Sequence, residues 1–425
     1  MNPQAGLSFE QAPPISLPLR FFLTAPLFLL AAAVLILFAP EALNSRTVPA
    51  AYALTHALTL GFLAMAMIGA LMQMLPVMAG TPMPMPRAVA LVTHVSLSIG
   101  TMALMAGFLG AGAAVIDAAA ALLALGFAAF LAAAGTSLAR ASDNATVTGI
   151  RFAAAGLAVT AILGIALALA RTGLELPLAI QAASAAHIAF GLLGWILVLV
   201  VGVSYQVVPM FQITPPYPRL LTRWLGASLF LLLLVHAAAP LLPAAVLLAA
   251  DSALAAGILL FALATLRQQA RRRRKLPDIT LDFWRTGMAS LIACVLAWLV
   301  AQLWPAWQNS GAYPLLLGVL FLGGFGVSVV IGMLYKIVPF LAWFHLQAQL
   351  QAKAGTIPNM KQMIGEKRLR MQFRLHLAAL VMLIAAVAWP NALHVPAGIA
   401  LALSALLLLV NLLSGLRIYL RHGGR

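Results

Sequence analysis

Long apolar stretches, separated by short polar segments, run along almost the whole chain. A helix needs about 20 apolar residues to cross a bilayer, because the hydrocarbon core offers no partner to an unpaired backbone group. Twelve stretches of roughly this length occur, at 19–39, 51–79, 87–109, 112–138, 150–170, 180–211, 222–239, 242–267, 284–303, 314–342, 372–390 and 395–418. The pattern therefore predicts an all-α integral membrane protein with twelve transmembrane helices.

The composition agrees with a membrane protein and excludes several other classes. Of the 425 residues, 64% are apolar and 8% are charged, and the mean hydropathy is +1.04. Soluble domains are about half apolar and about a quarter charged, so the chain is neither a disordered protein nor a soluble nucleic-acid-binding domain. Cys294 is the only cysteine, which excludes an intrachain disulfide, a CxxC pair, an iron–sulfur cluster and a CxxCH haem attachment.

The net charge of +16 arises from basic residues that the predicted topology places on one side of the membrane. Loops on the cytoplasmic side carry the excess of Lys and Arg, so both termini are expected on the cytoplasmic side of a bacterial inner membrane. The expected partner of this surplus is the lipid bilayer with its anionic headgroups, and no nucleic-acid partner is expected. Only Arg46 and Arg171 fall on the other side. The basic residues of the cytoplasmic side are Arg20, Arg87, Arg140, Arg151, Arg219, Arg223, the run from Arg271 to Lys275, the cluster from Lys361 to Arg374, Arg417, Arg421 and Arg425.

One motif occurs three times, with 133 and then 130 residues between successive copies. Each copy contains a glycine followed by an aromatic residue, then a second glycine, a polar residue and a proline at fixed spacing. The first glycine, the second glycine and the proline lie within a narrow stripe of a helix, and glycine there lets two membrane helices approach closely. The copies are Gly61, Phe62, Gly69, Gln73 and Pro76; Gly194, Trp195, Gly202, Gln206 and Pro209; and Gly324, Phe325, Gly332, Lys336 and Pro339.

The three copies fall on the second, sixth and tenth predicted helices, which indicates three four-helix repeats. The repeats are expected at 19–140, 150–267 and 284–418. A cytoplasmic N-terminal tail at 1–18, a basic cytoplasmic linker at 268–283 and a cytoplasmic tail at 419–425 complete the expected organisation.

In this organisation the chain resembles subunit I of the haem-copper oxidases. The segments His56 to Pro76 and His187 to Pro209 are similar to a divergent branch of that superfamily, which includes the NnrS-like proteins and uncharacterised relatives described as permeases. The resemblance covers most of the chain, from about residue 19 to about residue 418, and implies twelve helices in pseudo-threefold arcs. It also implies a low-spin haem ligand near the outer end of the second helix, and copper ligands on the sixth and seventh helices.

Three histidines match these positions in kind. His56, His187 and His236 are expected in the outer leaflet, where neutral imidazole can ligate haem iron or copper. The alternative is that each ring makes an interhelical hydrogen bond and binds no metal. His94 is a weaker candidate and is expected to make a structural polar contact. The remaining histidines are expected at the surface or in a loop, namely His345, His376, His394 and His422.

Other features of the oxidases are missing from the sequence. The tenth predicted helix, Tyr313 to Ala342, contains no histidine, the seventh has no His-His pair, and no tyrosine lies one turn from His187. The resemblance therefore implies a role other than oxygen reduction, in nitric-oxide or metal homeostasis or in support of a respiratory or denitrification membrane complex. Two alternatives stay open: a permease for a small solute or metal ion, and an assembly factor that binds no ligand.

A methionine-rich segment and the polar position of the motif complete the set of candidates. The thioethers of Met83 and Met85 can bind Cu(I), or they fill irregular apolar gaps as methionine commonly does. Gln73, Gln206 and Lys336 are expected near the inner face, where they would line a polar mouth. Alternatively, the Lys336 ammonium extends to the lipid headgroups.

Overall fold

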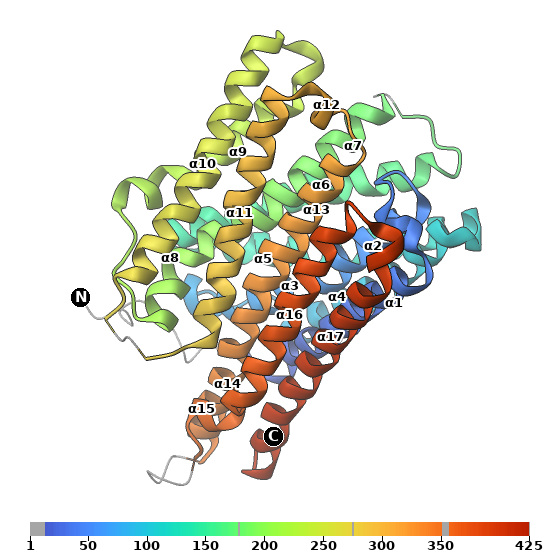
Figure 1. Ribbon diagram of the computed structural model, residues 1–425. Coiled ribbons are helices and arrows are strands. Elements are labelled where there is room, and N and C mark those ends of the chain that lie inside the picture. Colours follow the sequence, from blue (N-terminus) through green and yellow to red (C-terminus); the bar gives the residue numbers. More distant parts are fainter. Residues whose placement is uncertain (1–12, 177–178, 274–275, 351–356, 425) are drawn as a thin grey trace. The chain divides into compact units, whose positions relative to one another are not determined.

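The computed structural model describes residues 13–176, 179–273, 276–350 and 357–424. These residues are almost entirely helical and contain no strand. Twelve helical segments are long and apolar enough to cross a membrane, as the hydrophobic pattern predicts. The described chain therefore has the architecture of an all-α membrane protein (Figure 1).

Most of the spans are single α-helices. In chain order these are α1 (Ser16–Phe38), α5 (Ala113–Arg140), α6 (Ala145–Ala170), α9 (Arg219–Ala237), α10 (Ala244–Ala270), α11 (Ile279–Leu303), α16 (Glu366–Ala386) and α17 (Pro390–Arg421). Short helices in the connections are η2 (Pro40–Leu43), η6 (Ala239–Leu241), α12 (Pro305–Gln308) and α15 (Met360–Met363).

The other spans contain a π-helical segment, in which the backbone is wound more loosely than in an α-helix. The third span is α4 (Pro86–Ala106) followed by η4 (Gly107–Ala111). In the second, sixth and tenth spans the π-helical segment lies between two α-helical parts, and it contains the glycine–aromatic pair of the sequence motif. These spans are α2 (Pro49–His56), η3 (Ala57–Ala64) and α3 (Met65–Ala79); α7 (Ile180–Ala189), η5 (Phe190–Leu197) and α8 (Val198–Gln212); and α13 (Ala312–Gly318), η7 (Val319–Val327) and α14 (Ser328–Leu350).

Helix ends differ from the prediction at all three expected cytoplasmic segments. The C-terminal tail expected at 419–425 is shorter, because α17 continues to Arg421. The N-terminal tail was expected to reach residue 18, but α1 begins at Ser16, and Leu17 and Pro18 are buried. The linker expected at 268–283 is shorter, because α10 continues to Ala270 and α11 begins at Ile279. Asp278 caps α11 by accepting the Thr280 backbone N–H, and such a cap satisfies a donor that the helix leaves unpaired.

The helices form two compact lobes. Among the described residues, lobe 1 consists of Pro13, 70–176 and 179–273, and lobe 2 consists of Pro14–Gly69, 276–350 and 357–424. In lobe 1, α4 packs on α5, and α6 packs on α5, α8 and η5. In lobe 2, α17 packs on both α1 and α16, and α11 packs on η7 and α14.

The motif glycines all lie against the span that precedes them. A Cβ atom added to Gly202 would lie 2.8 Å from the Gly149 Cα, and one added to Gly69 would lie 2.6 Å from the Phe21 Cβ. In each span the two contacted residues of the preceding helix are seven positions apart. The contacts pair Gly61 with Phe28 and Gly69 with Phe21 on α1, Gly194 with Gly156 and Gly202 with Gly149 on α6, and Gly324 with Ser290 and Gly332 with Phe283 on α11.

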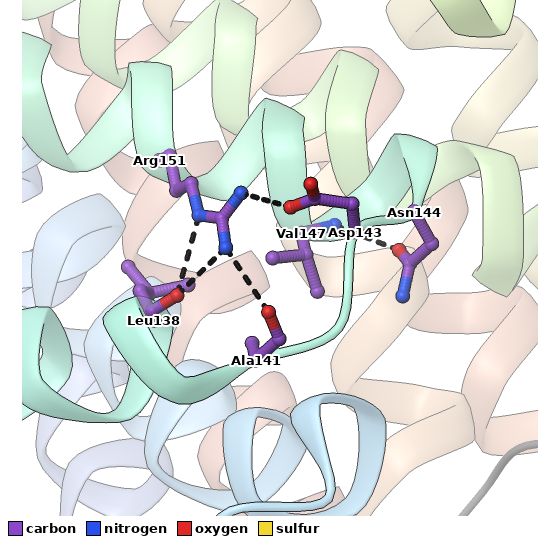
Figure 2. Close-up of polar contacts among 6 residues, drawn as sticks. All are labelled: Leu138, Ala141, Asp143, Asn144, Val147 and Arg151. Carbon is purple, nitrogen blue, oxygen red and sulfur yellow. Dashed lines mark hydrogen bonds and ion pairs between the residues drawn. The ribbon is translucent and has the colours of Figure 1, made fainter.

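Arg151 on α6 holds the connection that follows α5 (Figure 2). Its Nη2 donates to the carbonyls of Leu138 (2.9 Å) and Ala141 (3.1 Å), and its Nη1 pairs with the Asp143 carboxylate. The last carbonyls of a helix have no partner within that helix. Arg151 supplies one, and Asn144 caps the start of α6, so this turn is fixed on both sides.

Candidate functional site

Basic residues gather at one end of each lobe. The position of other residues along the helices of that lobe is described below relative to this end. In lobe 1 it is the end where α5 and α10 finish and α6 and α9 begin, with Arg140, Arg151, Arg219 and Arg223. In lobe 2 it is the end where α14 and α17 finish and α11 and α16 begin, with Lys367, Arg368, Arg374 and Arg417. Each is called the basic end of its lobe below.

His187 lies on α7, in the half of lobe 1 away from the basic end. Its Nδ1 is 3.0 Å from the Thr160 carbonyl oxygen on α6. Because a carbonyl only accepts, Nδ1 carries the hydrogen, and in the neutral ring Nε2 holds the lone pair. Gly164 makes room for the ring, since a Cβ there would lie 2.7 Å from the His187 Cε1. The imidazole is therefore fixed in position and tautomer by α6.

His236 lies at the far end of α9 and pairs with a carboxylate. Its Nδ1 is 2.8 Å from Oδ1 of Asp251 on α10. Both side chains are partly buried, with 35% and 29% of their surface exposed. A carboxylate behind an imidazole fixes the orientation of the ring, as it does for many metal-bound histidines. Asp251 is a functional candidate that the sequence pattern did not single out, because the pair forms only when α9 and α10 pack.

His56 lies in lobe 2 as the last residue of α2, directly before the π-helical segment η3. Its Nδ1 is 2.7 Å from the Tyr52 carbonyl oxygen, one turn earlier in the same helix. This contact again places the hydrogen on Nδ1 and the lone pair on Nε2. The ring is thus held in orientation by a carbonyl of its own helix.

The structure does not show these three histidines converging on one site. His187 turns toward α6 and His236 toward α10, while His56 belongs to the other lobe. Among the described residues, no group of three or more His, Cys, Asp or Glu side chains is placed to hold a metal ion. Each ring has the tautomer that metal binding through Nε2 requires, and one imidazole is enough for the proximal ligand of a haem.

The weaker candidates have separate environments. His94 is partly buried on α4. Met83 is buried, whereas Met85 is 74% exposed and adopts a left-handed backbone conformation at the start of α4. Because one thioether is buried and the other is exposed, the two sulfur atoms lie in different environments.

Lys336 makes an ion pair with Asp278. Its Nζ is 2.7 Å from Oδ2 of Asp278, at the basic end of lobe 2. Burial alone would raise the pKa of the Asp278 carboxyl, but the Lys336 ammonium and hydrogen bonds from Thr280 together hold that pKa below its ordinary value. The motif position is otherwise occupied by Gln73, which is buried, and Gln206, which is partly buried, both in lobe 1.

The expectation of a solvated His376 is wrong. Helix α16 begins at Glu366, earlier than the expected residue 372, so His376 lies well inside the span and is only 2% exposed. Its Nε2 is 2.7 Å from the Ser328 Oγ on α14. His345 and His394 also lie within helices, α14 and α17, and are partly buried, whereas His422 is exposed as expected.

His376 belongs to a group of buried polar residues in lobe 2, here called the polar cluster. Phe283 on α11 lies at its centre, with ring centroids 5.5 Å from His376 and 6.1 Å from Tyr335. The members are Trp284, Ser328, Tyr335, Gln372, His376, Ser404 and Asn411, and all are at least 95% buried. Their hydrogen bonds join Asn411 Nδ2 to Tyr335 Oη (3.0 Å) and Gln372 Nε2 to Ser404 Oγ (3.0 Å). Sequence reasoning missed this cluster, although Gln372 and His376 are one helical turn apart at the edge of an apolar stretch.

Comparison with known proteins adds no relative from which a role could be transferred. No protein-family model matches the chain, and a search of curated proteins found no match.

Proposed function

We propose that this chain is a haem- or copper-binding membrane protein, a divergent relative of subunit I of the haem-copper oxidases. Its role is in nitric-oxide or metal homeostasis, or in support of a respiratory or denitrification complex, and not in oxygen reduction. It lies in a bacterial inner membrane, with the basic ends of both lobes facing the cytoplasm, as the positive-inside rule requires.

The observation that carries the proposal is the common hydrogen bonding of His56, His187 and His236. Each ring donates from Nδ1 to an oxygen acceptor, two of them backbone carbonyls and one a carboxylate. This arrangement leaves Nε2 as the basic nitrogen and is the usual support of a metal-bound histidine. A bound haem or copper ion would supply redox chemistry or diatomic-gas binding, and each of these residues would hold and orient a group bound at its own position.

The recurring structure of the second, sixth and tenth spans supports the threefold repeat. Each span has a π-helical segment around its glycine–aromatic pair, and each contacts the preceding helix at two residues seven positions apart. π-helical segments occur often at functional sites. A repeated module with such a segment in its second helix is consistent with an oxidase-like arrangement of the helices.

Oxygen reduction is excluded from the proposed role because the tenth span lacks the histidine ligands that it would need. The resemblance would require histidine ligands for two haems there, and α14 has only His345, beyond Pro339 toward the basic end. His376 does not replace them, because its Nε2 is engaged by Ser328.

The test is to compare variants of each histidine in protein purified from cells supplied with haem and copper. We expect His187→Ala or His236→Ala to lower the bound haem or copper, whereas His422→Ala, at an exposed position, leaves it unchanged. Asp251→Asn should weaken metal binding about 10- to 100-fold, because it removes the carboxylate behind the ligand. Equal cofactor content in all variants would exclude these histidines as ligands.

A permease is the second candidate, and the polar interior of lobe 2 favours it. The Lys336–Asp278 ion pair lies at the basic end, and the polar cluster continues along the same helices. Polar and ionisable groups inside a membrane commonly mark a path for an ion or solute.

Lys336→Gln tests this alternative, because glutamine is the residue found at the same motif position in the other two copies. Reconstituted vesicles would be supplied with Cu(I) outside and a copper-sensing dye inside. Copper-dependent fluorescence that rises in wild-type vesicles and falls to the protein-free rate in Lys336→Gln supports a permease. Wild-type vesicles that behave like protein-free ones contradict a copper permease.

A further inference from the structure

Several buried polar atoms of lobe 2 have no hydrogen-bond partner within the described part of the chain. Four of them belong to the polar cluster, namely Trp284 Nε1, Gln372 Oε1, His376 Nδ1 and Asn411 Oδ1, and another, His345 Nε2, lies outside it. Leaving a polar atom unpaired in an apolar interior is unfavourable. Four such atoms in one cluster therefore indicate a bound molecule that satisfies them.

Contacts of Phe283 connect two of these residues, His376 directly and Asn411 through Tyr335. The Phe283 ring packs against His376 and Tyr335, and Tyr335 accepts the hydrogen bond from Asn411. Gln372 lies one turn before His376 on α16. A Cβ on Gly332 would meet both Phe283 and the Trp284 ring, at 2.9 and 3.3 Å, so glycine lets the indole pack directly on α14.

The chemistry of the unpaired atoms defines what they can bind. Trp284 Nε1–H is a donor, and the amide oxygens of Gln372 and Asn411 are acceptors. The Ser328 hydroxyl can donate to His376 Nε2, which makes Nδ1 a second donor. A set of two donors and two acceptors, with no charged side chain among the cluster members, suits a small neutral molecule that both donates and accepts hydrogen bonds.

We propose that the polar cluster of lobe 2 is a binding site for internal water, set between α11, α14, α16 and α17. A buried water molecule typically makes about three hydrogen bonds to polar groups that would otherwise be unsatisfied. Water at this site pairs the four atoms and hydrates His376 deep within the span. This inference does not depend on the haem, copper or permease proposals, because it rests on the cluster alone.

X-ray radiolytic footprinting of the full-length protein in lipid nanodiscs tests the site directly. Hydroxyl radicals form from water where it is bound, so they oxidise buried side chains that are next to internal water. We expect Phe283, Trp284 and Tyr335 to be oxidised several-fold faster than Phe130 and Phe261, which are equally buried in lobe 1. In H₂¹⁸O the oxidised cluster residues should carry ¹⁸O.

A double variant, Gln372→Leu with Ser404→Ala, then removes one complete polar pair and replaces it with apolar side chains. We expect slower oxidation of Trp284 and His376, with Phe261 unchanged as the internal control. If the variant does not fold, the oxidation rates measured in the wild-type protein still test the proposed water site. Oxidation of Phe283 and Trp284 at the rate of Phe130 and Phe261 would overturn the proposal.

Discussion

Single imidazoles in this protein are held by oxygen atoms of neighbouring backbone or side chains. His56 and His187 use carbonyls, His236 uses Asp251, and His376 uses the Ser328 hydroxyl. A hydrogen bond of this kind inside a membrane stabilises the fold by about 0.5–2 kcal/mol. Each of these hydrogen bonds therefore stabilises the fold modestly and fixes the orientation of its ring.

Replacing His376 with alanine should destabilise the protein measurably. The change leaves Ser328 without its partner and opens a space beside Phe283, so we expect a loss of about 1–3 kcal/mol. The matched control is His422→Ala, because His422 is exposed. Thermal unfolding in one detergent would measure both variants. Equal melting temperatures for the two would show that the His376–Ser328 contact does not contribute.

Asp278→Asn should reduce stability in a pH-dependent way. The pKa of Asp278 is lowered in the folded protein, so the carboxylate stabilises the fold above its unfolded pKa, and this stabilisation is lost as the pH falls through the folded value. Wild type should therefore exceed the variant in unfolding temperature at pH 7, and the gap should close as the solution becomes more acidic than about pH 4. A gap that widens on acidification would contradict the Lys336–Asp278 pairing.

At the residue scale, the sequence predicted the positions of the candidate histidines along their helices better than it predicted their surroundings. The depth of His56, His187 and His236 follows from the apolar pattern alone. Their acceptors do not, because Thr160 and Asp251 reach these rings only after neighbouring helices pack. His376 was misjudged because the basic residues of the first turns of α16 made that segment look like a loop, although a charged helix start can extend beyond the membrane.

At the scale of helices, close contact at glycine organises the packing of the second, sixth and tenth spans. Where α6 packs on α8, Gly149 and Gly202 place two backbones against each other. Small residues permit such contacts in membranes. The motif spacing predicted this contact face from the sequence, whereas the π-helical segments beside it could not be predicted, since no residue pattern specifies them reliably.

Gly202→Ala should weaken the packing of α6 on α8. The added Cβ would lie 2.8 Å from the Gly149 Cα, and overpacking of this kind typically destabilises a protein by about 1–3 kcal/mol. Gly226→Ala on α9 is the control, because a Cβ there has nothing within 4 Å. The control should be neutral or slightly stabilising, by up to about 1 kcal/mol from helix propensity. Equal melting temperatures for the Gly202→Ala and Gly226→Ala variants would refute close packing at Gly202.

At the scale of the whole molecule, the distribution of charge sets the expected orientation in the membrane. In a Cys294→Ser background, we expect Asn309→Cys to react with a membrane-impermeant maleimide added to intact cells. His422→Cys, at the expected cytoplasmic end, should react only after the membrane is permeabilised. Both positions are exposed. The opposite labelling pattern would place the basic ends outside and remove the basis for assigning the histidines to the outer leaflet.

The most direct test of the haem and copper proposal is an absorption spectrum combined with metal analysis of the purified protein. The account predicts a Soret band or bound copper in near-stoichiometric amount, which is reduced when His187 or His236 is replaced. It also predicts that ligand loss lowers the unfolding temperature, since a ligand bound only to the folded state stabilises it. A colourless, metal-free protein that is folded and stable after expression with ample haem and copper would contradict it.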